Sequence, residues 1–275
     1  MLKKHLIMCS AILVISLTAK MFIYSAPASI TSLINISSES QKAEKPVDSY
    51  FNSLSFADEF LPLGDSRIVT KMNRTLHAHS RAKLQTSRLH NQASKWFPII
   101  EPILAKYGIP EDFKYMPLVE SGLKAGVSPK GAAGFWQFMP ETARGFGLKV
   151  NSSVDERKNI HKSTIAAAKY IKSLYREFNS WTLAAAAYNI GEGRLKRHIN
   201  HQNQDNYFKM KLNRETASYV YKLISMKEII ENPTRYGYTS KVSKLLAKNN
   251  ATTHNTFPYG APVNSEIGNK GVLIN

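Results

Sequence analysis

Glu120 is the residue in this sequence whose surroundings most favour acid–base chemistry. It follows the apolar run 115–119, "YMPLV", at the expected end of a helix. Apolar neighbours disfavour a carboxylate anion, and so does the negative end of a helix dipole. Both effects raise the pKa toward the pH at which a proton donor works. The alternative is a solvated glutamate at a helix end, because most glutamates are exposed.

Polar residues and glycines follow Glu120 at short distances along the chain. Ser121 can orient the carboxyl by a hydrogen bond, although serines near helix ends more often bond the local backbone. Gly131 and Gly134 remove side chains where another backbone or a ligand comes close, or they simply form turns. Gln137 offers both a donor and an acceptor.

Two later segments place polar groups at helix positions. Tyr188 and Asn189 end the small-residue stretch "AAAAYNIG", and Tyr219 lies in "ETASYV". The structural alternative for each of them is packing and capping. The order of all these segments along the chain is more informative than any one of them.

Together the segments resemble the family 1 lytic transglycosylases, the SLT domain family, over roughly residues 50 to 238. The stretches "GFWQFMPETA" and "VDER" are most similar to the membrane-bound murein transglycosylase D subgroup. The ordered motifs are Glu120-Ser121, Gly131-x-x-Gly134-x-x-Gln137, Ala187-Tyr188-Asn189 and Glu215-Thr-x-x-Tyr219-Val220. Two departures are Ile190, where the family often has alanine, and Asn213, where it often has proline.

The resemblance implies a lysozyme-like fold and a role for each matching residue. Glu120 would be the catalytic acid and base, and Ser121 its orienting neighbour. The residues that would line the glycan cleft are Gln137, Tyr188, Asn189 and Tyr219. The implied reaction cleaves the β-1,4 bond between N-acetylmuramic acid and N-acetylglucosamine and leaves 1,6-anhydromuramyl ends. No cofactor is implied.

A single acid fits this reaction, because the sugar's own 6-hydroxyl replaces water. Ordinary glycosidases use two carboxylates about 5 to 10 Å apart. Asp155 and Glu156 in "VDERKN" are the carboxylates considered for a second role. A turn that caps and pairs with the next helix explains them better.

Helical patterns dominate the chain and predict a mainly α fold. The predicted helices are a long one from Arg67 through Leu89, then 96–107, 111–120, a short one near Pro140, 163–178 with Ser163 as its cap, 181–190 and 214–230. Gly122 and Gly191 are expected to end two of them. No alternating strand pattern competes with these helices. We therefore divide the chain into an N-terminal helical region, 49–95, and a lysozyme-like catalytic domain, 96–238.

The N-terminal segment reads as an export signal. Lys3 and Lys4 precede an apolar stretch, and "APA" at 26–28 suits signal-peptidase cleavage, with an uncleaved anchor as the alternative. Residues 29–48 read as a linker and 239–275 as a flexible tail with no room for peptidoglycan-binding LysM repeats. These features predict location in the cell envelope, in the periplasm, with membrane association through the N-terminal segment.

Charge favours an anionic partner. The chain carries a formal charge of +17, and residues 1–28 hold three lysines as their only Lys, Arg, Asp or Glu side chains, so +14 remains on the rest. Export points to peptidoglycan glycan strands as this partner and away from nucleic acid. The histidine pairs 77/79 and 198/201 lack nearby acids or cysteines, so no metal is predicted. A lysozyme-like muramidase and a non-catalytic peptidoglycan-binding protein remain the alternatives, and the oligomeric state is left open.

Overall fold

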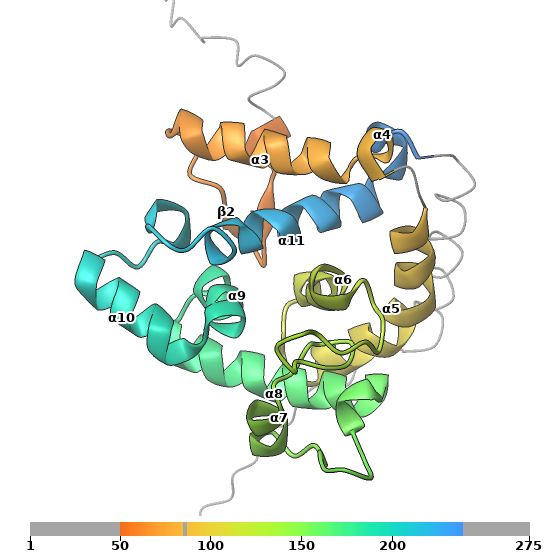
Figure 1. The fold of residues 1–275 in the computed structure, drawn as a ribbon. Coiled ribbons are helices and arrows are strands. Elements are labelled where there is room, and N and C mark those ends of the chain that lie inside the picture. The colour runs from red at the N-terminus through yellow and green to blue at the C-terminus, as the bar shows by residue number, and fades with distance from the viewer. Residues whose placement is uncertain (1–49, 85–86, 239–275) are drawn as a thin grey trace, which may run out of the picture. The chain divides into compact units, whose positions relative to one another are not determined.

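The computed structural model describes residues 50–84 and 87–238. The predicted export signal, linker and tail lie outside these residues. The described chain is mainly helical, as the periodicity predicts, and this fold class is confirmed (Figure 1). None of the helices in the described ranges is both long and apolar enough to cross a membrane.

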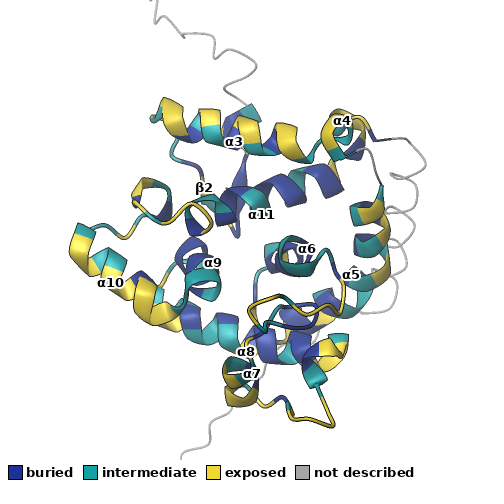
Figure 2. Cartoon of the chain, viewed as in Figure 1, coloured by how far each residue is buried: buried dark blue, intermediate teal, exposed yellow. Residues whose placement is uncertain are grey.

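Helix α11, Thr216–Glu231, lies at the centre of the packing. Ten of its 16 residues are buried, so it is covered on more than one face. It contacts α3, α9 and α6, and Figure 2 shows it as a mostly buried helix beneath α3. The predicted helix 214–230 is therefore confirmed to within two residues at its start.

The predicted long helix from Arg67 through Leu89 is wrong, because the chain forms several shorter helices there. Helix α3 spans Ser66–His79, α4 spans Arg81–Leu84, and α5 spans Arg88–Lys106. Ser80 ends α3 in an extended conformation, which breaks the run of helical hydrogen bonds. The predicted apolar stripe Ile68, Met72 and Leu76 is buried within α3.

The segment before Glu120 begins as a tight helical turn. A 3₁₀ helix, η1, spans Glu111–Tyr115, and α6 spans Met116–Ser121. Pro117 lies in the first turn of α6, where its missing N–H leaves no helical hydrogen bond unmade. Gly122 ends α6 with φ of 61°, a left-handed conformation that favours glycine, so the predicted stop is confirmed.

A short hairpin precedes these helices and was not predicted. Strands β1, Ser55–Phe56, and β2, Glu59–Phe60, pair antiparallel, with Phe56 opposite Glu59. Ala57 and Asp58 form the connection with positive φ angles, and the Ala57 N–H donates to the Asp112 carboxylate at 2.7 Å. Two-residue strands are too short to show alternation, and this turn lacks the usual Asn-Gly signature.

The remaining helices follow one another along the chain. They are α7, Pro140–Gly145; η2, Glu156–Lys158; α8, Ile160–Phe178; α9, Trp181–Ile190; α10, Glu192–Gln202; η3, Tyr207–Lys209; and η4, Pro233–Tyr236. Helix α10 was not predicted. The predicted cap Ser163 is wrong, because Asn159 caps α8 by accepting the Lys162 N–H at 2.9 Å. Ser163 is buried within the helix.

A loop between α6 and α7 lies against the backbone of η2. Gly134 has φ of 82°, and a Cβ atom there would lie 1.8 Å from the carbonyl oxygen of Arg157. The Arg157 side chain donates to the carbonyl oxygens of Gly131, at 2.9 Å, and Phe138, at 3.0 Å. Arg157 therefore holds this loop at two points, and the absence of a side chain at Gly134 lets the two backbones come into contact.

We expect Gly134→Ala to destabilise the protein more than Gly131→Ala. Both glycines have positive φ, but a Cβ on Gly131 meets no atom within 4 Å. Gly131→Ala should therefore cost only the left-handed conformation, about 1–2 kcal/mol. Gly134→Ala adds overlap with the Arg157 carbonyl, and this overlap should cost about 1–3 kcal/mol more. Urea unfolding of both variants measures the difference, and equal losses would contradict the close approach.

Candidate active site

Glu120 lies in the last turn of α6 with its side chain partly buried. Burial raises its pKa to about 7; the hydrogen bond from Tyr219 opposes this rise, the charge of Glu215 adds to it, and the charge of Lys222 opposes it. A carboxyl with this pKa holds its proton in about half of the molecules at neutral pH. It can therefore donate a proton and later accept one.

Tyr219 fixes the carboxyl from α11. Its hydroxyl donates to Glu120 Oε1 at 2.5 Å, and the residue is only 2% exposed. Burial raises the pKa of the Tyr219 phenol well above its usual value, so it remains a neutral donor. This bond joins two helices that are about 100 residues apart in the sequence and sets the direction of the acid.

Tyr188 connects α9 to the loop beside the acid. Its hydroxyl donates to the carbonyl oxygen of Trp136 at 2.8 Å, and its ring packs against Phe138 and Tyr170. Burial and then the Glu120 charge raise the pKa of the Tyr188 phenol. Trp136 is fully buried and donates its ring N–H to Thr164 at 2.9 Å. Tyr188 thus supports the loop, and its role in the cleft remains a prediction.

Among the hydrogen bonds of the described residues, those of the Ser121 hydroxyl join it to the backbone, and none joins it to the Glu120 carboxyl. Its hydroxyl donates to the carbonyl oxygens of Phe135, at 2.8 Å, and Pro117, at 3.0 Å. The direct orienting contact predicted for Ser121 is therefore replaced by the alternative, a backbone partner. Ser121 holds the loop against the end of α6, and Tyr219 holds the acid.

Gln137 stabilises its own turn. It has φ of 47°, and its amide donates to the carbonyl oxygen of Gly134 at 2.8 Å. The side chain is partly exposed at the surface of the loop. A role for Gln137 in the cleft remains a prediction.

Asn189 joins the ends of α9 and α11. Its amide oxygen accepts from the Thr216 hydroxyl at 2.8 Å, and its amide nitrogen donates to the Glu215 carboxylate at 3.4 Å. Glu215 is exposed, and its charge acts on Glu120. No role was predicted for Glu215, although it lies in the same motif as Tyr219.

The carboxylates considered for a second role hold a turn together. Asp155 pairs with Arg157 at 2.8 Å, and Glu156 pairs with Lys162 at 2.5 Å. The hydrogen bond from Arg157 lowers the pKa of Asp155, and the backbone N–H of Lys149 lowers that of Glu156. The structural explanation for both residues is therefore confirmed.

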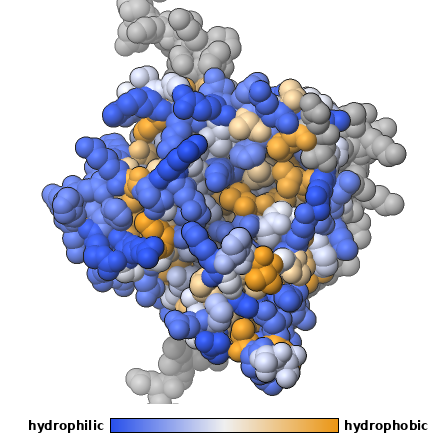
Figure 3. Space-filling model, in the orientation of Figure 1, coloured by the Kyte–Doolittle hydropathy of each residue, from blue (hydrophilic) through white to orange (hydrophobic). Residues whose placement is uncertain are grey.

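The face of the molecule shown in Figure 3 carries both hydrophobic and hydrophilic residues. Figure 3 shows hydrophobic residues near the middle of this face, around α6 and the neighbouring loop, among hydrophilic ones. A depression of about 520 Å³ lies beside Tyr170, between α7, α8 and α10, with Arg194 and Arg197 in its lining. Within residues 50–84 and 87–238, no three His, Cys, Asp or Glu side chains gather in a way that could hold a metal ion.

The central segment of the chain is similar to a known protein family. Residues 98–211 match the family model of the transglycosylase SLT domain, so the predicted resemblance to this family is confirmed. Glu120, Gln137, Tyr188 and Asn189 lie inside the match. Tyr219 lies after it.

Relatives extend the similarity over about half of the chain. A membrane-bound lytic murein transglycosylase D from Escherichia coli (strain K12) is 34% identical over 152 residues, which cover 52% of this chain and 34% of that protein. A protein called a putative tributyltin chloride resistance protein, from Alteromonas sp. (strain M-1), is 35% identical over 133 residues, 46% of this chain and 64% of that one. This chain therefore spans about a third of the E. coli relative.

A solved structure also matches in part. The lytic transglycosylase Slt from Pseudomonas aeruginosa is 22% identical with a TM-score of 0.38, over 50% of this chain and 24% of that one.

We expect Glu120→Gln to stabilise the protein above pH 7 but not at pH 4. The folded state keeps the Glu120 proton up to a pKa of about 7, whereas the unfolded chain loses it near 4.5. The stabilising contribution of this proton is complete below pH 4.5 and is lost as the pH rises to 7, up to about 3 kcal/mol. Glutamine stays neutral and avoids this loss. Urea unfolding at pH 4 and pH 8 measures it, with the exposed Glu141→Gln as control, and a difference independent of pH would contradict the raised pKa.

Tyr219→Phe should shift the titration of Glu120 to higher pH. The Tyr219 hydrogen bond lowers the pKa of Glu120, so its loss leaves burial less opposed. The loss of activity on the alkaline side of the pH profile should then shift to higher pH. The maximal rate should also be lower. Tyr221→Phe removes a hydroxyl from the same helix without touching Glu120, so it should leave the pH profile in place. An unshifted pH profile in Tyr219→Phe would show that the bond does not set this pKa.

Proposed function

We propose that the chain is a peptidoglycan lytic transglycosylase. It would cleave the β-1,4 bond between N-acetylmuramic acid and N-acetylglucosamine and form 1,6-anhydromuramyl ends. The observation that carries this proposal is the partly buried Glu120, with a pKa of about 7 and a hydrogen bond from Tyr219. The SLT domain at 98–211 supports the choice of substrate.

Glu120 serves as acid and then as base in the proposed reaction. Its proton passes to the glycosidic oxygen as the bond to muramyl C1 breaks, and the N-acetylglucosamine hydroxyl leaves. The substrate's acetamido group stabilises the cationic C1. The Glu120 carboxylate then removes the proton of the muramyl 6-hydroxyl, whose oxygen bonds to C1. The carboxyl is regenerated and no water is consumed.

The neighbouring residues take supporting roles in this proposal. Tyr219 positions the acid and stabilises its anion between the two steps. Gln137, Tyr188 and Asn189 would line the glycan cleft, and Ser121 would hold the loop that forms one side of it. The catalytic domain would span 96–238 and rest on the helical region 49–95.

Location in the cell envelope follows from the proposed substrate. The E. coli relative is named as membrane-bound, which is consistent with an envelope protein. We propose export to the periplasm and attachment through residues 1–28. The net charge of +17 would favour contact with an anionic wall or membrane surface.

A muramidase that hydrolyses the same bond is the second candidate, and Glu215 favours it. Its carboxylate is near enough for its charge to raise the pKa of Glu120. A second carboxylate that activates water is what an ordinary glycosidase requires. The two candidates differ in their products.

We expect digestion of purified peptidoglycan to yield 1,6-anhydromuramyl ends. The 6-hydroxyl is part of the bound sugar, so orientation alone gives it a large effective concentration relative to water. These ends are lighter than hydrolysed ends by one water, and borohydride does not reduce them. Mass analysis of the borohydride-treated products distinguishes the two. Reducible muramic acid as the main end would make the protein a muramidase, with Glu215 as the base to examine.

Glu120→Gln should lower this cleavage by about 100-fold to 10,000-fold, the usual contribution of a positioned acid or base. Glutamine keeps the size of the side chain and an acceptor for Tyr219 but has no proton to give. Release of soluble fragments from sacculi measures the loss, with Glu141→Gln as the matched control. Near-normal cleavage by Glu120→Gln would rule out this assignment. Absence of cleavage by the unaltered chain, with intact sacculus binding, would favour a non-catalytic binding protein.

A further inference from the structure

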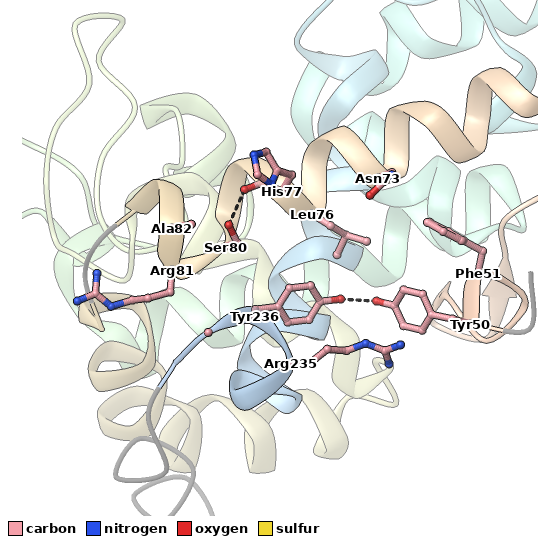
Figure 4. Close-up of a pocket in the computed structure, with 11 residues that line it drawn as sticks. Tyr50, Phe51, Asn73, Leu76, His77, Ser80, Arg81, Ala82, Arg235 and Tyr236 are labelled. Carbon is pink, nitrogen blue, oxygen red and sulfur yellow. Dashed lines mark hydrogen bonds between the residues drawn. The ribbon is translucent and has the colours of Figure 1, made fainter. Parts of the chain in front are cut away.

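A second pocket lies outside the SLT match. It has a volume of about 670 Å³ and lies between α3, α4, η4 and residues 50–51. Figure 4 shows the rings of Tyr50 and Tyr236 lying end to end, with a hydrogen bond between their hydroxyl groups. Leu76 of α3 faces this pair. The tyrosine rings and Leu76 give the pocket an apolar lining.

Two arginines make this pocket positive. Arg81 from α4 and Arg235 from η4 line it, and none of its lining residues is acidic. In Figure 4 their guanidinium groups lie on opposite sides of the Tyr236 ring. Neither arginine forms an ion pair with another described residue. Glu228 accepts a hydrogen bond from Tyr50 at 3.1 Å but does not line the pocket.

Stacking holds Arg235 in place without using its donors. The central carbon of its guanidinium group lies 3.7 Å from the centre of the Tyr50 ring. A guanidinium group stacked on a ring keeps its N–H groups free at the edge, where they can bind a carboxylate with two parallel hydrogen bonds. Arg235 is thus ordered before a ligand arrives, which lowers the entropy lost on binding.

We propose that this pocket binds the peptide stem of peptidoglycan through its carboxylates. The inference rests on the proposed function, which brings the wall polymer to the protein. Peptide stems combine carboxylates with alanine methyl groups, and the pocket combines guanidinium groups with an apolar lining. Inorganic phosphate would use the cations but leave Leu76 and the tyrosine rings without a partner. The protein would then hold the peptide at a site separate from the one that cleaves the glycan.

Calorimetric titration with a free wall tetrapeptide, L-alanyl-γ-D-glutamyl-meso-diaminopimelyl-D-alanine, tests this proposal. The protein is the full chain carrying Glu120→Gln. We expect added Arg81→Gln or Arg235→Gln to raise the Kd about tenfold or more, because each removes hydrogen bonds to a charged group. Arg176→Gln removes the same charge from an exposed position on α8 and should change the Kd less than about twofold.

An amidated tetrapeptide provides a test that needs no pocket variant. Its loss of carboxylates should weaken binding to the intact pocket by a similar factor. Failure of the tetrapeptide to bind, equal weakening by Arg176→Gln, or unchanged binding after amidation would each overturn the inference. Tighter binding of inorganic phosphate than of the tetrapeptide would also overturn it and assign the pocket to a phosphate ligand.

The binding assay and the cleavage assay fail independently. The free tetrapeptide has no glycosidic bond and Glu120→Gln strongly lowers cleavage, so peptide binding does not depend on the reaction. Peptide binding by a chain that yields no anhydromuramyl ends would contradict the proposed function alone. Anhydromuramyl ends from a chain that does not bind the peptide would contradict the peptide pocket alone.

Discussion

Desolvation of the Glu120 carboxyl is the constraint on which the candidate site depends. Burial raises its pKa to about 7, and the Tyr219 hydrogen bond limits that rise. A carboxyl with the same burial and no donor would remain protonated, whereas a solvated one would lose its proton well below neutral pH. Helices α6 and α11 must therefore hold the Glu120 carboxyl against the Tyr219 phenol where water is partly excluded. The packing of α11 between α3, α9 and α6 provides this geometry.

The region before the SLT match supports the helices that carry the site. Glu59 of β2 caps the start of α9 by accepting the Thr182 N–H at 3.1 Å, and Tyr188 is carried at the other end of that helix. Lys71 of α3 donates to the carbonyl oxygen of Ala217 at 2.7 Å, two residues before Tyr219. Contacts from outside the matched segment thus fix the positions of both tyrosines. Side-chain hydrogen bonds therefore join the site to its N-terminal support.

Features that depend on local residue patterns were predicted correctly from the sequence. Features that depend on contacts between distant residues were missed. The apolar run before Glu120 and Gly122 after it indicated a buried acid at a helix end, and both features are present. A pattern of apolar residues does not show where backbone bonds break, so the stop at Ser80 was missed. Ser163 resembled a cap by residue type, but Asn159 begins the helix. The partner of the acid was assigned to its neighbour Ser121, because sequence alone does not show which phenol reaches it from another helix.

A single carboxyl that acts twice needs both of its protonation states to be accessible, and the charges around Glu120 keep them so. Glu215 disfavours the anion, while Lys222 and the Tyr219 hydroxyl favour it. Tyr219 and Lys222 are three residues apart on α11, so one helix face presents both groups that stabilise the carboxylate. Burial of the carboxyl and the charge of Glu215 have the opposite effect, because both favour the protonated form of Glu120. Because burial outweighs the groups that favour the anion only far enough to bring the pKa to about 7, both protonation states are populated near neutral pH. In the proposed reaction, the proton would therefore leave for the glycosidic oxygen and another would return from the 6-hydroxyl without a second acid or base.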